Sequence, residues 1–348
     1  MKSTFKNLAI KITAKLLQQP PIEQQLADNS IQLSQPLPEL ANEPSPYTLA
    51  LSGSKMSTSD RDDIVFITSR FRSGSTLLWN LFRKTPQCTA YYEPFNERQW
   101  FNKQMRGANV DTTHRGVDDY WTEYDNLSGL SQTYNENWIH SALYMSEHSW
   151  DPQMKRYIEQ MIETAPGRPI LQFNRIDFRL PWIKQHFPNA KILHLYRHPR
   201  DQWCSFLTDH ELMNKDDVIH TYQDAFYLDV WCHDLAKHYP VLDKRNTPQP
   251  YQRFYYLWKL SYLHGLKFSD LGISFETLTT APQQSISDIF DILGIAKNNI
   301  DSLVDVIKAP PPERWRKYAD ESWFLQHESI CERNLSLMLK NFPIADHI

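Results

Sequence analysis

Two arginines and a glycine stand between an apolar run and an amphipathic segment in IVFITSRFRSGSTLLWNLF, residues 64–82. The apolar, β-branched residues at 64–69 predict a buried strand, and the pattern that follows predicts a helix over 75–84. A turn at a helix N-terminus presents backbone N–H groups and the positive end of the helix dipole, which favour a phosphate or sulfate. Arg72 adds a positive charge within the turn. This stretch therefore predicts an oxyanion-binding site.

The Walker A pattern G-x-x-x-x-G-K-[ST] is the first comparison for such a turn. Gly74 and Thr76 fit it, whereas Ser69 replaces the first glycine and Ser75 replaces the lysine. Without that lysine, a nucleoside triphosphatase loses its main cation for the β- and γ-phosphates. A P-loop nucleotide kinase or other phosphotransferase remains an alternative. A purely structural alternative is a helix start with Ser73 or Ser75 as its N-cap.

A second motif follows about 120 residues later, in KILHLYRHPRDQWCSFL. Its apolar half predicts a strand over 191–197 that delivers Arg197 to its carboxyl end. A helix is predicted over 200–208, because Pro199 suits the first turn of a helix. Ser205 lies eight residues beyond the arginine. A planar guanidinium and a hydroxyl suit a phosphate monoester dianion, so this motif predicts a second phosphate-binding site.

Together the two motifs resemble those of sulfotransferases that use 3′-phosphoadenosine 5′-phosphosulfate (PAPS). SRFRSGSTLL is similar to the family's 5′-phosphosulfate-binding loop, in which Lys or Arg stands two residues before the glycine. Arg197 and Ser205 have the spacing of the family's 3′-phosphate pair, and ERWRKYADE at 313–321 resembles the segment that closes over the nucleotide. ISFETLTTAPQQSISDIFDILGI resembles the late strand and helix, with Phe275 in place of the usual tyrosine. The implied nucleotide contacts are Arg72, Ser73, Gly74, Ser75, Thr76, Arg197, Ser205, Arg314, Arg316 and Lys317.

The resemblance covers roughly residues 63–320 and implies transfer of a sulfuryl group from PAPS to a hydroxyl, with adenosine 3′,5′-bisphosphate as the other product and no metal. The implied fold is α/β, with a parallel central sheet and helices on both faces, of the P-loop NTPase-like sulfotransferase type. Strands alternating with helices predict the same sheet from the residues alone. Further strands are expected at 169–174 and 271–276. Further helices are expected at 151–164, 180–187, 219–238, 251–265 and 282–293.

Sulfuryl transfer is an in-line displacement, and it needs a cation for the leaving oxygen and a base for the acceptor proton. Arg72 is placed for the first role. Glu93, in YYEPF, is the candidate base. The helix predicted at 75–84 carries the chain roughly 14 Å away from the loop, and the seven residue-to-residue steps from Pro86 to Glu93 can span about 23 Å if extended. The chain can therefore bring Glu93 back to the loop. Family branches that sulfate tyrosyl or sugar hydroxyls place a catalytic glutamate at a similar distance. The alternative for Glu93 is an ion pair with a basic neighbour.

Small-molecule members of the family use a histidine in a K-T-H segment, but here the matching QFNRIDF has Asn174 and Arg175. This departure favours Glu93 as the base, and Arg175 is a candidate contact to the sulfonate or the acceptor. The unmatched stretch 96–168 is predicted to be an acceptor-side insertion. Aromatic rings between 91 and 150 suggest a groove for a sugar, with phenols and lipids as other acceptors. A catalytically silent nucleotide- or glycan-binding protein is the remaining alternative.

Composition limits the other functions and the location. The 348 residues have a formal net charge of −4, so the electrostatic footprint of a general nucleic-acid binder is missing. Four separate cysteines fit a reducing, cytoplasmic compartment, and the 13 histidines include no H-E-x-x-H cluster for a metal. No apolar run suffices to cross a membrane. Residues 1–18, basic and amphipathic, are compatible with a helix packed on its own domain, lying on a membrane surface, or targeting the chain. The expected organisation is an N-terminal helix and polar linker over 1–62 and one domain over 63–348.

Overall fold

Five strands of the described residues form a parallel sheet in the order β2-β3-β1-β4-β5. The strands are β1 (Val65–Ser69), β2 (Cys88–Tyr92), β3 (Arg168–Phe173), β4 (Lys191–Tyr196) and β5 (Leu271–Ser274). The computed structural model describes residues 61–111, 114–311 and 313–341, and the predictions for residues 1–60 lie outside them. Apart from residues 148–150, the described residues belong to one structural unit. The predicted α/β fold with a parallel sheet is confirmed.

Strand β1 lies at the centre of the sheet, where it pairs with β3 on one side and β4 on the other. All five of its residues are buried, as the continuous apolar pattern requires for a strand covered on both faces. Ser69, the last residue of β1, lies opposite Leu195 near the end of β4. Because the two strands are parallel, the segments that follow them emerge at the same edge of the sheet.

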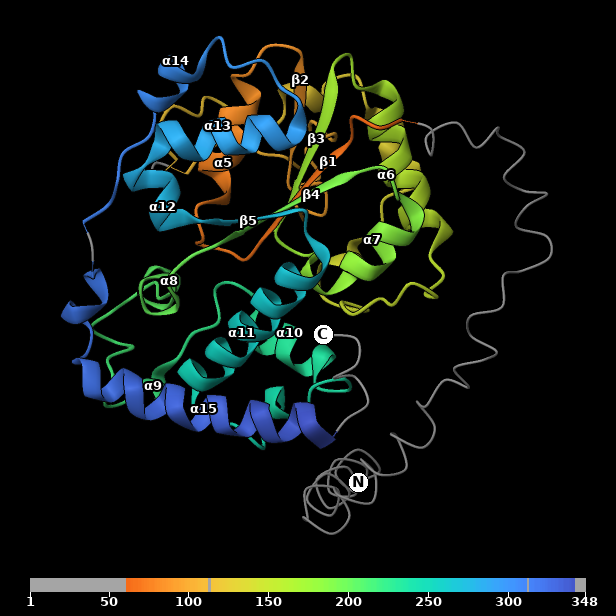
Figure 1. Ribbon diagram of the computed structural model, residues 1–348. Coiled ribbons are helices and arrows are strands. Elements are labelled where there is room, and N and C mark those ends of the chain that lie inside the picture. The colour runs from red at the N-terminus through yellow and green to blue at the C-terminus, as the bar shows by residue number, and fades with distance from the viewer. Residues whose placement is uncertain (1–60, 112–113, 312, 342–348) are drawn as a thin grey trace, which may run out of the picture. The chain divides into compact units, whose positions relative to one another are not determined.

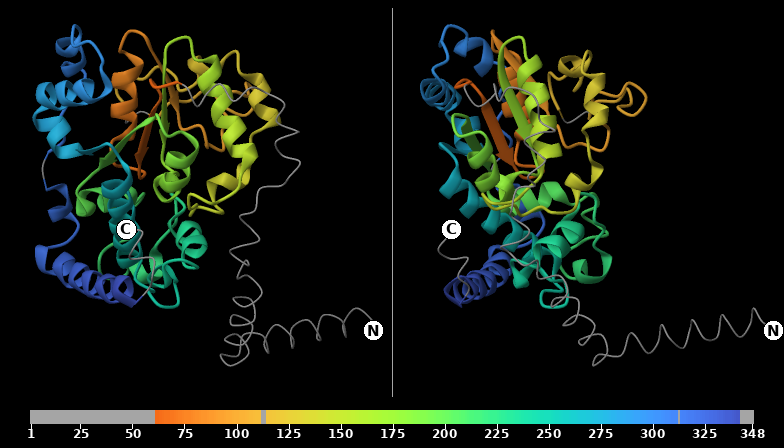
Figure 2. Two further views of the ribbon diagram at one scale, coloured as in Figure 1. Left: turned by 45° about the vertical axis from the view of Figure 1, so that its right-hand side comes forward. Right: turned by 90° about the vertical axis from the view of Figure 1, so that its right-hand side faces the viewer.

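Helices cover both faces of the sheet (Figures 1 and 2). One face carries α5 (Ser75–Arg83), α12 (Phe275–Thr280) and α13 (Pro282–Leu293), and the other carries α6 (Pro152–Thr164), α7 (Leu180–His186) and α11 (Pro250–Phe268). Phe82 of α5 and Phe290 of α13 pack together on the first face, with ring centroids 6.5 Å apart. Phe66 of β1 packs against Phe187 just after α7, with centroids 5.3 Å apart. These contacts join the layers into one hydrophobic core.

A second hydrophobic cluster lies beyond the carboxyl ends of the strands. Its helices are α8 (Pro199–Phe206), α10 (Leu228–Leu235), α11 and the C-terminal α15 (Glu321–Asn341), which packs against α11 (Figure 1). Trp203 of α8 is fully buried between Tyr251 and Phe254 of α11. The short elements of the remaining chain are η5 (Asp177–Arg179), α9 (Val218–Thr221), η6 (Pro240–Leu242), α14 (Ile300–Val304) and η7 (Arg314–Lys317).

Two predicted elements differ from the structure. The helix expected at 219–238 is divided into α9 and α10, because the Asp224 carboxylate accepts hydrogen bonds from the N–H groups of Leu228 and Asp229 at 2.8 Å and starts a new helix there. The strand expected at 271–276 ends at Ser274, whose hydroxyl caps α12 by accepting from the N–H of Thr277. Elsewhere the predicted strands and helices match the observed ones to within about three residues.

The segment predicted as an insertion contains three short 3-10 helices before α6. They are η2 (Thr122–Tyr124), η3 (Ser128–Gln132) and η4 (Glu136–Ile139). Most of its aromatic rings are buried in the main core, so they form core packing and not an open groove. The proposed domain start at Asp63 stays a prediction, although Arg61 already donates hydrogen bonds to the carbonyls of Ile162 and Gly167. None of the described helices is long and apolar enough to cross a membrane.

Candidate active site

The turn between β1 and α5 is shaped by Gly74. This residue is the N-cap of α5 and has φ of 94°, a region that L side chains rarely adopt. A Cβ at Gly74 would also lie 2.3 Å from Cδ2 of Phe275. Two independent constraints therefore require glycine here. The result is an N-terminus of α5 whose first N–H groups lack intrahelical acceptors and are free to bind an anion.

Arg72 connects this turn to the second motif. Its Nε donates hydrogen bonds to both the carbonyl oxygen and the hydroxyl oxygen of Ser205, each at 3.0 Å. Its Nη1 lies 3.9 Å from a carboxylate oxygen of Asp111. The backbone of Arg72 is held in the left-handed region, with φ of 65°. The phosphosulfate loop and the 3′-phosphate motif predicted from the sequence are thus brought together by a direct side-chain contact.

Arg197 reaches the same place from the end of β4. Its Nη1 donates to the carbonyl of Arg72 at 3.0 Å, and its guanidinium lies 4.9 Å from the centre of the Phe275 ring. Its Nε is buried and has no hydrogen-bond partner within the described part of the chain. Burial lowers the pKa of Arg197, the carboxylates of Asp201 and Glu276 oppose this effect, and Arg314 and Arg72 add to it. A bound anion would satisfy the unpaired N–H of Arg197.

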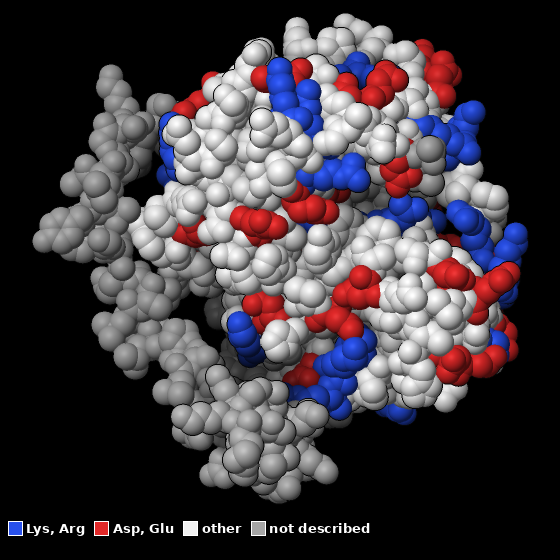
Figure 3. All heavy atoms as spheres, turned by 180° about the vertical axis from the view of Figure 1, so that it is seen from behind, with Lys and Arg blue, Asp and Glu red and all other residues white. Residues whose placement is uncertain are grey.

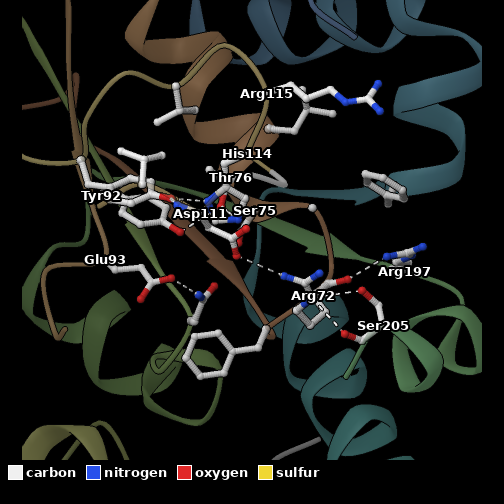
Figure 4. A pocket seen from close by; sticks show the side chains of 18 of the residues that line it. Arg72, Ser75, Thr76, Tyr92, Glu93, Asp111, His114, Arg115, Arg197 and Ser205 are labelled. Atoms are coloured by element: carbon white, nitrogen blue, oxygen red, sulfur yellow. Dashed lines mark hydrogen bonds and ion pairs between the residues drawn. The ribbon is translucent and has the colours of Figure 1, made fainter. Parts of the chain in front are cut away.

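A cavity of about 810 Å³ opens at this point, over the N-terminus of α5 (Figure 4). Of the residues predicted to form the site, eight line it, namely Arg72, Gly74, Ser75, Thr76, Glu93, Arg197, Ser205 and Arg314. Ser73 is buried and donates its hydroxyl to the carbonyl of Arg70 at 2.7 Å, so it shapes the loop from behind. The sequence motifs thus converge on a single cavity.

Glu93 lies directly after β2, and its carboxylate forms part of the cavity wall. It is 4% exposed and accepts hydrogen bonds from the side-chain amides of Asn174 and Asn96. Burial raises the pKa of Glu93, while Arg175 and Asn96 oppose that rise. A carboxylate whose pKa is raised towards neutrality is a better proton acceptor than one in water. The position and the environment of Glu93 suit a general base.

A family model described as "Sulfotransferase family" matches residues 64–299, more than half of the chain. The chain belongs to the sulfotransferase family. The match begins at the first residue of the apolar run before the turn that contains Arg72 and Gly74, and it extends through both motifs and past α13.

Several solved structures also match this sulfotransferase. Sulfotransferase STF9 from Mycobacterium avium is 12% identical with a TM-score of 0.43, and the match covers 85% of this chain and 81% of that one. The sulfotransferase domain of the Synechococcus PCC 7002 olefin synthase is 17% identical with a TM-score of 0.39, and the match covers 81% of this chain and 98% of that one. Retinol dehydratase in complex with androsterone and the inactive cofactor PAP is 15% identical with a TM-score of 0.35, and the match covers 79% of this chain and 81% of that one. A comparison with curated proteins gives no match.

In this sulfotransferase Arg175 lies behind Glu93 and is not among the residues that line the cavity. Its guanidinium contacts the carboxylates of Glu93 at 3.4 Å and Glu97 at 3.1 Å. Its side chain is 1% exposed and lies 5.0 Å from the centre of the Phe71 ring. The structure therefore assigns it to holding the two glutamates, whereas the contact with sulfonate or acceptor expected from the sequence has no support in this geometry.

The C-terminal segment contributes fewer cations than its sequence suggested. Arg314 lines the cavity, but Arg316 and Lys317 do not. Arg316 is exposed and paired with Glu313 at 2.8 Å. Lys308, which no motif marked, lines the cavity instead. In the sequence Lys308 is simply a basic residue shortly before a run of prolines, and this pattern is too common to identify a ligand-binding residue.

His114 is a second residue that sequence reasoning missed. It lines the cavity on the side of the insertion, with Nε2 3.3 Å from the Thr76 hydroxyl. Burial lowers the pKa of His114, Arg72 adds to this effect, and Asp111 opposes it. A single histidine in an irregular segment has no spacing that marks it. Only the tertiary fold brings His114 next to Thr76 at the start of α5.

The acidic residues of the insertion are largely neutralised. Asp119 and Glu123 both pair with Arg83 of α5, at 2.9 and 2.7 Å, and Asp125 pairs with Arg106 at 2.7 Å. Figure 3 shows basic and acidic side chains interspersed over one face of the molecule. The negative charge of these three carboxylates is therefore largely compensated within the protein.

Proposed function

We propose that this sulfotransferase takes the sulfuryl group from PAPS and transfers it to a hydroxyl group of a carbohydrate. The observation that carries the proposal is the contact of Arg72 with Ser205, which makes one anion-binding surface from the two motifs. Because the two motifs are about 120 residues apart in the chain but in contact in the fold, one ligand can reach both of them. A nucleotide with phosphate groups at the 5′ and 3′ positions is such a ligand.

The residues present fit that donor. The unpaired Nε of Arg197 and the hydroxyl of Ser205 supply donors for a 3′-phosphate, and Arg72 with the N-terminus of α5 supplies them for the 5′-phosphosulfate. Arg314 and Lys308 add two exposed cations at the rim of the cavity. A volume of about 810 Å³ is within the usual range for a ligand of this size.

The proposed chemistry is an in-line displacement at sulfur. When bound, the donor supplies an activated sulfuryl group whose bond to the 5′-phosphate oxygen breaks as the acceptor oxygen forms its bond to sulfur. Arg72 and the N-terminus of α5 stabilise the negative charge that develops on the departing phosphate. Glu93 accepts the proton that leaves the acceptor hydroxyl. Asn174, Asn96 and Arg175 hold the carboxylate in place for this step.

The polarity of the cavity wall supports a carbohydrate acceptor. Around Glu93 the wall carries hydrogen-bonding side chains, namely Asn96, Glu97, Arg98 and Asn109. The half-buried rings of Phe71 and Phe226 also line the cavity and offer apolar surface for the face of a sugar ring. A polyhydroxylated acceptor would find both kinds of contact in this cavity.

The proposed compartment is the cytoplasm. Cys88, Cys204, Cys232 and Cys331 are all free thiols, and the last three are buried. Free cysteines are typical of a reducing compartment.

The donor is tested by calorimetry with adenosine 3′,5′-bisphosphate and with ATP, each with and without Mg²⁺. We expect the bisphosphate to bind and ATP to bind weakly. Tight ATP binding with Mg²⁺-dependent turnover would instead establish the phosphotransferase. The reaction is tested with labelled PAPS and a panel of sugars, phenols and lipids, where we expect transfer to a sugar. Binding of the bisphosphate without transfer to any of them would favour a silent nucleotide-binding protein.

A further inference from the structure

A chain of hydroxyl and imidazole groups approaches the N-terminus of α5 from the insertion. The Tyr120 hydroxyl lies 2.5 Å from Nδ1 of His114, and Nε2 of the same ring lies 3.3 Å from the Thr76 hydroxyl. Thr76 in turn lies 2.9 Å from the Tyr92 hydroxyl. Figure 4 shows His114 above Thr76, on the side of the loop opposite to Arg197. Both ring nitrogens of His114 are engaged, and neither the base Glu93 nor the arginines account for this arrangement.

The neighbours of Tyr120 favour one direction for these hydrogen bonds. The Tyr120 hydroxyl oxygen already accepts a hydrogen bond from the backbone N–H of Asp111 at 3.0 Å, and its own proton is available to donate. Nδ1 of His114 lies within reach of that proton and is the acceptor that we infer for it. A neutral imidazole has one N–H, which is then on Nε2. That N–H points at Thr76, whose hydroxyl oxygen is the acceptor.

Thr76 is therefore left with its hydroxyl proton free to donate. Without a ligand, that proton has the Tyr92 hydroxyl as an acceptor. Thr76 is the second residue of α5, where the helix N-terminus favours an anion, and it lines the cavity. A hydroxyl in this place stabilises a bound anion only if it donates its proton towards it.

We propose that His114 is a positioning residue that fixes Thr76 as a hydrogen-bond donor to the phosphosulfate of the donor substrate. The inference rests on the proposed function, because it requires an anion at the N-terminus of α5. It adds to that function a role for the insertion, which supplies both His114 and Tyr120. A histidine that only filled space would not need a hydrogen-bond partner at each ring nitrogen, as His114 has in Tyr120 and Thr76.

The tautomer can be measured without any ligand. Nitrogen-15 NMR of the full chain distinguishes an imidazole with the proton on Nε2 from one with the proton on Nδ1, and loss of signals in a His114→Gln variant assigns the ring. We expect the Nε2–H form at neutral pH, and a shift away from it in Tyr120→Phe. An Nδ1–H form in the unmodified protein would overturn the inference.

Variants of His114 then test its action through Thr76. Glutamine retains an N–H donor, whereas leucine at the same position offers none and adds no charge. For His114→Leu we expect the affinity for adenosine 3′,5′-bisphosphate and kcat/KM for PAPS to fall roughly 10- to 100-fold, as for loss of a hydrogen bond to a charged group, with His114→Gln recovering most of the loss. His140→Leu, in the same insertion but outside the cavity, is the matched control and should change neither value.

A double-mutant comparison separates this inference from the proposed function. In a Thr76→Val background the His114 substitutions should have little further effect, because the hydroxyl that they act on is missing. Equal effects with and without Thr76 would contradict the positioning role. If the unmodified protein neither binds the bisphosphate nor transfers sulfuryl from PAPS, the proposed function itself fails, and the NMR result still reports on the tautomer.

Discussion

Nε of Arg72 donates hydrogen bonds to the carbonyl and the hydroxyl of Ser205, each at 3.0 Å, across 133 positions of the chain. Arg197 adds a second link by donating to the carbonyl of Arg72. These contacts exist because β1 and β4 are parallel neighbours, so the segments after them meet at one edge of the sheet. The same edge is where α/β proteins generally bind ligands.

Arg72→Ala should reduce kcat roughly 100- to 1,000-fold, the usual loss when a group that stabilises transition-state charge is removed. Its effect on the affinity for adenosine 3′,5′-bisphosphate should be smaller, because the charge it meets develops during the reaction. Steady-state kinetics and calorimetry measure the two quantities. Arg156→Ala, which removes an exposed arginine of α6 paired with Glu163, serves as the control. Equal losses of rate and affinity would contradict the role assigned to Arg72.

Glu93→Gln should keep the affinity for the donor and lower the rate roughly 100- to 10,000-fold, as for loss of a general base. Because burial raises the pKa of Glu93, the rate of the unmodified enzyme should fall as the pH is lowered through that raised value. The residual rate of Glu93→Gln should lack this acidic limb. A pH–rate profile for both proteins measures the difference. An identical acidic limb in the variant would exclude Glu93 as the base.

Gly74→Ala should impair both folding and nucleotide binding. The added methyl group meets the Phe275 ring and is strained by the positive φ of Gly74, and such backbone strain costs on the order of 1–3 kcal/mol. Thermal unfolding measures the stability loss. Adding Phe275→Ala removes the clash but not the strain, so the double variant should recover only part of the loss of binding. Normal binding by Gly74→Ala alone would show that the turn is not the anion site.

Acid should destabilise the fold through His194, a residue of β4 outside the active site. Burial lowers its pKa to about 4 from an ordinary value near 6.5. Between these pH values the imidazole is protonated in the unfolded chain but neutral in the folded one. The free energy of unfolding therefore falls as the pH drops from about 6.5 to about 4. The loss for this one group reaches about 3 kcal/mol. In His194→Leu the unfolding free energy should depend less on pH over this range, and an unchanged slope would contradict the assignment.

The sequence predicted four of the five strands and one side of the cavity because both depend on local patterns. Apolar runs indicated β1, β3, β4 and β5, whereas the edge strand β2 was not predicted. The loop and strand-end motifs indicated Arg72 and Arg197, which the structure brings together in one cavity. The break between α9 and α10 was missed, because helical periodicity continues across the point where the Asp224 carboxylate caps a new helix.

The insertion side of the site was less predictable. His114 and Lys308 reach the cavity only through tertiary packing of irregular segments, which no spacing reveals. Arg175 and Arg316 were overestimated for a related reason. A sequence shows a cation near a motif but does not show the glutamates that pair with it, here Glu93 for the first and Glu313 for the second.

The central claim is that a 3′-phosphate is held by Arg197 in the same cavity as the phosphosulfate loop. The most direct test compares the binding of adenosine 3′,5′-bisphosphate with that of adenosine 5′-monophosphate by calorimetry, in the unmodified protein and in Arg197→Ala. We predict that the unmodified protein prefers the bisphosphate roughly 10- to 100-fold, the contribution of a charge-assisted hydrogen bond, and that Arg197→Ala loses this preference while still binding the monophosphate. Equal affinities for the two nucleotides in the unmodified protein, or a preference that survives the substitution, would contradict the claim.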